Sequence, residues 1–128
     1  MGLIVNPIAG IGGRVGLKGS DGLEIQQQAL ALGAVPLAQE RTAAALEVLH
    51  PLAEDLELVT APGEMGETIA RDNGFTPQPL TTSNLPTESL AVTTPEDTRH
   101  AAQAMCAAGV DLILFTGGDG TALSLIHI

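Results

Sequence analysis

Apolar and polar residues follow two different periods along this chain, and the two periods alternate. Apolar stretches of strand length lie at 3–5, 56–59 and 112–115. Helical spacing with start or stop signals predicts helices over 24–32, 39–49, 65–72 and 95–108. The stretch 76–93 is rich in Pro, Thr and Ser and is expected to be mostly loop, with one short strand near Leu80 or Leu90. The order of strands and helices predicts an α/β fold.

The last predicted helix and strand are the best-defined part of this pattern. Thr94 is typical of an N-cap, Pro95 takes the first helical position and Gly109 ends the helix. The strand Leu112–Phe115 has no polar alternation, which favours a central parallel strand covered by helices on both faces. We therefore expect a doubly wound, Rossmann-like parallel sheet. In a truncated domain this strand is expected to be partly uncovered and to promote association.

Size and charge limit the classes of function. At 128 residues the chain has room for about one ordinary domain. A hydrophobic fraction of 45% supports a packed core, which is aliphatic because the chain has two Phe and no Trp or Tyr. The formal net charge of -10 repels polyanions, so neither nucleic acid nor an anionic membrane is an expected partner. A small nucleotide remains compatible, because backbone amides, a few cations and Mg²⁺ act at short range.

Cysteine, histidine and the N-terminus add exclusions. Cys106 has no second cysteine to pair with and is expected to be a small buried residue of a helix. His50, His100 and His127 lack the spacing of metal ligands, so we expect no metal site built from protein side chains. The N-terminus has no basic leader, and no apolar run is long enough to span a membrane, which predicts a cytoplasmic protein.

A glycine-rich loop follows the first strand. Gly10, Gly12 and Gly13 allow backbone N–H groups to converge on a phosphate, and Arg14 and Lys18 place two of the five cations in the same loop. A plain connector, with cations that are simply solvated, is the alternative and stays open. The loop matches neither the Walker nor the Rossmann glycine fingerprint.

The last strand runs into the sequence Gly117-Gly118-Asp119-Gly120-Thr121. Glycines after a strand let the backbone approach a charged ligand, and Asp119 adds a carboxylate there. Thr121 is placed to cap a helix whose N-terminus favours anions. The combination predicts a phosphate site, with a turn aspartate between glycines as the alternative.

Three further residues have two interpretations each. Asn6 either contacts the ligand or bonds the local backbone in a turn. Glu64 and Asp97 are either motif residues or acidic residues near a helix start, which the helix dipole alone favours.

Taken together, the two glycine loops resemble those of a known superfamily. The pattern of Asn6-Pro7, Ala9-Gly10 and Gly12-Gly13, followed much later by residues 117–121, is similar to the NAD kinases and the diacylglycerol or sphingosine-type lipid kinases. Four segments look like the bacterial and archaeal ATP-NAD kinase branch related to the acetoin catabolism protein X: 2–7, 16–22, 60–66 and 96–98. The resemblance covers residues 2–121.

The resemblance implies a kinase that uses ATP and Mg²⁺ to phosphorylate the 2′-hydroxyl of the NAD adenosine ribose, giving NADP. It assigns the catalytic role to Asp119, as the base for the hydroxyl proton or as a ligand of Mg²⁺, and both roles stay open. Nucleotide-binding roles fall on Asn6, Gly10, Gly12, Gly13, Lys18, Gly117, Gly118, Gly120 and Thr121.

Such kinases continue into a second, largely β domain that supplies most of the NAD site. We therefore expect residues 1–121 to form an incomplete N-terminal nucleotide-binding domain, residues 122–128 to be a truncated or non-native tail, and this chain to be inactive alone. A homo-oligomeric full-length parent stays open. Two alternatives also stay open: a non-catalytic nucleotide-binding or regulatory protein linked to acetoin catabolism, and a kinase of the same superfamily acting on a lipid or other hydroxyl acceptor.

Overall fold

The computed structural model describes residues 1–9, 37–81, 94–126 and 128. The strands in these ranges are β1 (Gly2–Val5), β2 (Val59–Thr60), β3 (Gln78–Pro79) and β4 (Ile113–Thr116). The helices are α3 (Ala38–Leu49), α4 (Glu67–Asp72), α5 (Pro95–Ala107) and α6 (Asp119–Ile126), with 3₁₀ turns η1 (His50–Leu52) and η2 (Gly63–Met65). Among the described helices, none combines the length and the apolarity needed to cross a membrane.

The strands pair in parallel, in the order β3-β2-β1-β4. β1 pairs with β4 along its whole length, from Gly2 opposite Ile113 to Val5 opposite Thr116. The strand order reverses beside β1, because the chain builds outward to β3 and then crosses back to the other side of β1. In open α/β sheets ligands bind at such a switch point, outside the carboxyl ends of the strands. A ligand site is therefore expected at the segments that follow β1 and β4.

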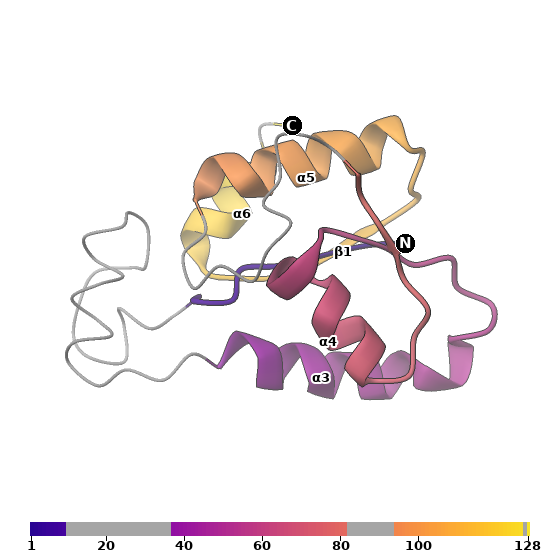
Figure 1. The fold of residues 1–128 in the computed structure, drawn as a ribbon. Helices are drawn as coiled ribbons and strands as arrows, with labels where there is room; N and C mark the ends of the chain where they lie inside the picture. The colour runs from indigo at the N-terminus through magenta and orange to yellow at the C-terminus, as the bar shows by residue number, and fades with distance from the viewer. Residues whose placement is uncertain (10–36, 82–93, 127) are drawn as a thin grey trace.

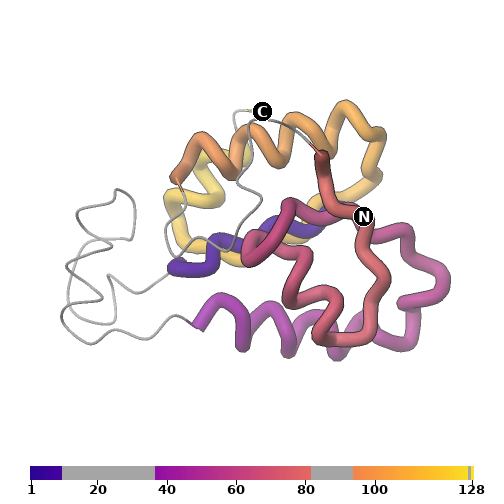
Figure 2. The backbone as a smooth tube through the Cα atoms, in the orientation of Figure 1, coloured from indigo at the N-terminus to yellow at the C-terminus, as the bar shows by residue number. Residues whose placement is uncertain are grey.

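Helices cover both faces of the sheet, α5 and α6 on one and α3 and α4 on the other (Figures 1 and 2). Successive β1 side chains alternate between the two layers. Leu3 and Val5 belong to the core shared with α3 and α4, and Ile4 belongs to the core shared with α5. All three are fully buried, and each such side chain stabilises the fold by about 1.5–3 kcal/mol. The predicted α/β parallel sheet is confirmed.

The N-terminus of α5 forms as its sequence predicts. The Thr94 hydroxyl accepts a hydrogen bond from the Asp97 N–H at 3.3 Å, and the Asp97 carboxylate accepts one from the Thr94 N–H at 2.8 Å. This is a capping box, so Asp97 has the helix-start role that was one of its two interpretations. At the other end Gly109 adopts a φ of +79°, which ends the helix. The capping residues and the terminating glycine were therefore sufficient to predict both ends of α5.

The place of β4 in the sheet differs from the prediction. Among the described strands β4 pairs with β1 alone, so it is an edge strand and not a central one. Strand order is set by crossover connections, which an apolar run does not encode. Leu112 is 63% exposed and Phe115 is 38% exposed, which confirms the expected partial exposure of this segment.

Two smaller expectations are also wrong. The second strand occupies Val59–Thr60 and does not extend back to residue 56. Cys106 is exposed, not buried. The buried face of α5 includes Ala101, Ala102 and Met105, and the next residue along a helix is rotated by about 100° away from that face.

Candidate functional site

The described start of the first motif, residues 6–9, lies beside the loop after β4, at the carboxyl ends of β1 and β4 and at the left of Figure 1. The Asn6 backbone N–H donates to the Thr116 carbonyl at 2.9 Å and extends the strand pairing. Its side-chain Nδ2 donates to Thr121 Oγ1 at 3.3 Å, and its Oδ1 accepts from the Ile8 N–H at 3.3 Å. Asn6 therefore forms the local turn and also links residues 115 positions apart. Contact between Asn6 and a ligand stays a prediction.

The two glycines after β4 differ in the space that a side chain would have at each position. A Cβ on Gly117 would collide with the Thr121 side chain in the first turn of α6. A Cβ on Gly118 would meet nothing within 4 Å, and Gly118 is not among the glycines with positive φ. Neither packing against the described residues nor backbone conformation requires a glycine at position 118. The space beside Gly118 is open.

Asp119 is the first residue of α6 and is exposed. In the described part of the chain its carboxylate has no hydrogen bond or ion pair. Negative charge in the first turn of a helix is favoured by about 0.3–1 kcal/mol, which stabilises Asp119 in this position. Because α6 begins at Asp119, the prediction that Thr121 caps the helix is wrong. Thr121 is buried within the first turn, where its hydroxyl meets Asn6.

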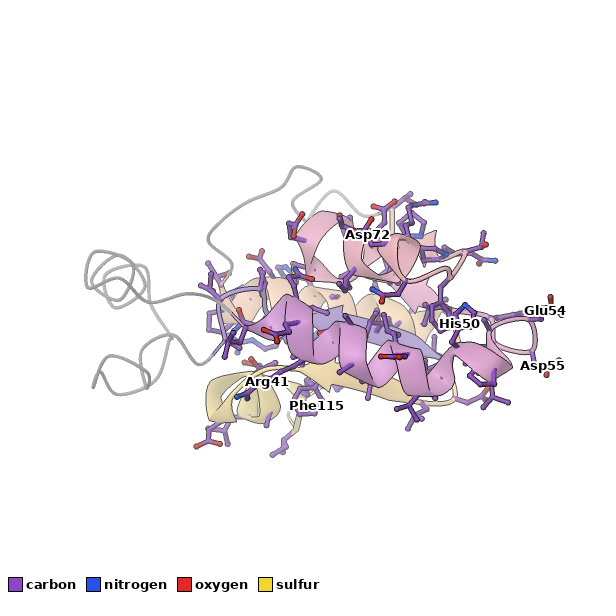
Figure 3. All side chains as sticks on the ribbon, turned by 90° about the horizontal axis from the view of Figure 1, so that it is seen from below. Arg41, His50, Glu54, Asp55, Asp72 and Phe115 are labelled. Atoms are coloured by element: carbon purple, nitrogen blue, oxygen red, sulfur yellow. The ribbon has the colours of Figure 1, made fainter. Side chains whose placement is uncertain are left out.

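A cavity of about 180 Å³ lies beside this loop. Its described walls come from the turn after β1, the start of α3 and the end of β4: Ala9, Leu37, Ala38, Arg41, Thr116, Gly117 and Gly118. Pockets for drug-sized ligands measure about 300–1,000 Å³, so these walls fit a part of a nucleotide, such as its phosphates, better than a whole one. Figure 3 shows the Arg41 side chain reaching from α3 toward the segment of β4 and α6.

Two threonine hydroxyls fix the end of β4 against α3. Thr42 is fully buried, and its Oγ1 lies 2.7 Å from Thr116 Oγ1 and 2.7 Å from the Ala38 carbonyl oxygen. Thr42 has one hydroxyl proton, so when it donates to Ala38 the Thr116 hydroxyl donates to Thr42. The pair holds Thr116 in place on the cavity wall.

Several predicted site residues lie outside the described residues: Gly10, Gly12, Gly13 and Lys18, together with Arg14, His127 and the predicted helix 24–32. The structure brings the other predicted site residues to one end of the sheet: Asn6, Gly117, Gly118, Asp119, Gly120 and Thr121.

The acidic residues after β2 serve the fold. Glu64 accepts hydrogen bonds from Gln39 Nε2, through its carboxylate at 3.1 Å and its carbonyl at 2.9 Å, and ties η2 to α3. Glu67 accepts from the Gly63 N–H at 3.1 Å and pairs with Arg71 at 3.0 Å. The Gly63 hydrogen bond, and then the Arg71 contact, lower the pKa of the Glu67 carboxyl below its ordinary value of 4.5.

The described side chains could hold a magnesium ion only together with oxygen atoms of a bound ligand. Within the described residues no three His, Cys, Asp or Glu side chains form a metal-binding group. Mg²⁺ in kinases is commonly held by one or two carboxylates together with substrate phosphates. The exposed Asp119 carboxylate beside an open loop fits that mode.

Two polar residues of the cavity wall are missing from the motif-based prediction. Arg41 and Thr116 line the cavity, but neither belongs to a glycine motif. The only sequence signal for Arg41 is that cations are few, five in 128 residues. The helix 39–49 is predictable from the sequence, but its placement against the sheet depends on tertiary packing. The position of Arg41 on the cavity wall therefore could not be predicted.

Comparison with known proteins tests the resemblance directly. A family model described as the ATP-NAD kinase N-terminal domain matches residues 1–128. No match was found among curated proteins or among solved structures. The family match covers both glycine motifs and continues through α6. The chain therefore belongs to the ATP-NAD kinase family, as its N-terminal domain.

Proposed function

We propose that this domain supplies the donor-phosphate half of an NAD kinase site. In the full-length parent the terminal phosphoryl group of ATP is transferred to the 2′-hydroxyl of the adenosine ribose of NAD, giving NADP. Membership of the family supports the kinase class. The position of the site at the switch point beside β1 and β4 supports nucleotide binding there.

The main support for this proposal is that Gly118 is a glycine with open space beside it and without a positive φ. A glycine costs conformational entropy in folding, by about 0.5–1 kcal/mol relative to alanine in regular structure. The described contacts and the backbone conformation give no reason for a glycine at this position. A ligand that approaches the backbone closely does give one, since a Cβ would stand in its place. Gly118 also lines the cavity, so a ligand bound there would lie beside the open space at this residue.

Asp119 is the proposed catalytic residue. Its carboxylate is exposed next to Gly118, and in the described part of the chain no partner engages it. Phosphoryl transfer needs positioning and electrostatic stabilisation more than covalent chemistry. Asp119 either accepts the proton of the attacking hydroxyl or binds Mg²⁺, which when bound would neutralise phosphate charge.

Changing Asp119→Asn in the full-length parent tests the proposal. The expected result is a fall in ATP-dependent NADP formation of about 10²–10⁴-fold, the usual contribution of general acid–base catalysis, with nucleotide binding retained. Asp111→Asn is the matched control, because Asp111 is also an exposed carboxylate but lies before β4, at the amino end of the strand. Equal activity of wild type and Asp119→Asn would contradict the proposed role. A parent that binds ATP without turnover would favour a regulatory protein.

The two roles of Asp119 differ in their dependence on pH and on Mg²⁺. Loss of a base removes the acid limb of the pH–rate profile. Loss of a metal ligand raises the Mg²⁺ concentration needed for half-maximal activity. Measuring both profiles for wild type and Asp119→Asn assigns the role.

We also propose that the 128-residue chain alone does not phosphorylate NAD, because the whole of it matches the N-terminal domain and the acceptor site is expected on a second domain. Incubation of the purified chain with ATP, Mg²⁺ and NAD should give no NADP. Measurable NADP formation would refute this part of the proposal.

A further inference from the structure

Arg41 is the one charged side chain among the described residues that line the cavity beside β4. The others are Ala9, Leu37, Ala38, Thr116, Gly117 and Gly118. No carboxylate lines the cavity within the described part of the chain, although the protein as a whole carries 15 acidic residues and 5 basic ones. The cavity is therefore locally cationic in an acidic protein.

The described arginines differ in their partners. Arg71 pairs with Glu67 and Arg99 pairs with Glu96, each on its own helix. The Arg41 guanidinium has no ion pair or hydrogen bond with any residue of the described chain. Arg41 is exposed, and its guanidinium retains all five N–H donors for an external anion.

The surroundings of Arg41 suit a phosphate group. A guanidinium forms a planar fork of donors that matches two phosphate oxygens. Glycine backbone at Gly117 and Gly118 lines the same cavity, and α6 begins at the next residue. A helix N-terminus adds partial positive charge on that side. The cavity volume of about 180 Å³ admits phosphate groups.

We propose that Arg41 binds a phosphate of the nucleotide held by the loop after β4. This inference rests on the proposed function and adds a binding residue that belongs to neither glycine motif. The phosphate belongs either to ATP, the donor, or to the pyrophosphate of NAD, the acceptor. Both present the same chemistry to the guanidinium, so the experiment must separate them.

The test measures the affinity of the 128-residue chain for ATP, NAD and adenosine by titration, in wild type, Arg41→Gln and Arg71→Gln. Arg71→Gln is the matched control, because it removes the same charge from the surface of another helix. The only ion-pair partner of Arg71 among the described residues is Glu67. Arg41→Gln should weaken ATP binding by about 10- to 100-fold, the usual worth of a hydrogen bond to a charged group. Binding of adenosine, which has no phosphate, should not change. Arg41→Lys should recover part of the loss, because it restores charge without the planar fork.

The outcomes separate this inference from the proposed function. Weakened binding of NAD with unchanged binding of ATP would place Arg41 on the acceptor and still support a phosphate contact. Equal affinities of Arg41→Gln and Arg71→Gln for both nucleotides would overturn the inference alone. Equal loss of adenosine and ATP binding in Arg41→Gln would also overturn it, because a structural role would then explain the effect. A full-length parent that binds ATP but forms no NADP would overturn the proposed function and leave the Arg41 result standing.

Discussion

Two loops of this domain have similar sequences and different structural roles. Each follows a parallel strand, contains at least two glycines and at least one acidic residue, and leads into a helix: 61–67 after β2 and 117–121 after β4. In the first loop the structure accounts for the glycines and for both acidic residues. In the second it accounts for Gly117, gives no reason for a glycine at position 118, and leaves the Asp119 carboxylate without a hydrogen bond or ion pair in the described part of the chain.

The loop after β2 is satisfied internally. Gly63 and Gly66 have φ values of +59° and +148°, a region that favours glycine. A Cβ on Gly66 would also lie 2.9 Å from the Leu3 carbonyl oxygen. The Glu67 carboxylate accepts from the Gly63 N–H and pairs with Arg71. A glycine-rich loop is therefore evidence for a ligand only where neither the packing nor the backbone conformation explains its glycines.

Replacing Gly66→Ala should have the largest effect on stability. Alanine is strained at a φ of +148°, and its Cβ meets backbone that cannot rotate away. We expect a loss of about 1–3 kcal/mol in the free energy of unfolding. Chemical denaturation of the purified chain measures it, and a loss below about 0.5 kcal/mol would show that the loop adapts.

Gly118→Ala should give the opposite pattern. Its Cβ meets no described atom and its φ is not positive, so the free energy of unfolding should be unchanged or slightly higher. ATP affinity should fall by about tenfold, equivalent to 1.4 kcal/mol, because the methyl group occupies space assigned to the ligand. Denaturation and calorimetric titration on the same preparation measure both quantities. Unchanged ATP affinity would remove the distinction between the two loops.

Asn6→Ala tests the link between β1 and the loop after β4. The change removes the hydrogen bonds to Thr121 and Ile8 and should cost about 1 kcal/mol of stability, together with a loss of ATP affinity. Asn73→Ala is the matched control, because Asn73 donates to the Ile69 carbonyl at the end of α4. It should cost similar stability and leave ATP affinity unchanged. Equal effects of both variants on ATP binding would argue against a special role for Asn6.

The smallest expected effect concerns Glu67 and pH. Its pKa is lowered in the folded state, so its stabilising contribution is complete above the ordinary pKa of 4.5 and is lost as pH falls through the lower folded value. Glu67→Gln should cost a few tenths of a kcal/mol at neutral pH. Below pH 4.5 the variant and the wild type should converge in stability. Stability curves that stay parallel down to pH 3 would contradict this role.

The sequence predicts those parts of the fold that depend on neighbouring residues. Thr94, Pro95, Asp97 and Gly109 define α5 because capping and helix termination involve residues only a few positions apart. The position of β4 at the edge of the described sheet is not predictable in this way, since it depends on which side of β1 the last crossover returns to. Cys106 shows the same limit within a helix, where one residue of rotation exchanges burial for exposure.

The candidate site is predictable to a similar extent. The motifs identify Asn6 and residues 117–121, which the fold brings together. They do not identify Arg41, whose place on the cavity wall results from the packing of α3 beside β4. They also do not distinguish Gly117 from Gly118, because the collision with Thr121 exists only after α6 has formed.

We expect the loop after β4 to bind nucleotide and the loop after β2 not to bind it. Backbone amide NMR of the 128-residue chain, titrated with ATP and Mg²⁺, tests it most directly. We predict that the amide signals of Gly117, Gly118, Asp119 and Gly120 shift with ATP concentration, while those of Gly63 and Gly66 stay in place. Shifts confined to Gly63 and Gly66, or no saturable shift in either loop, would contradict the account.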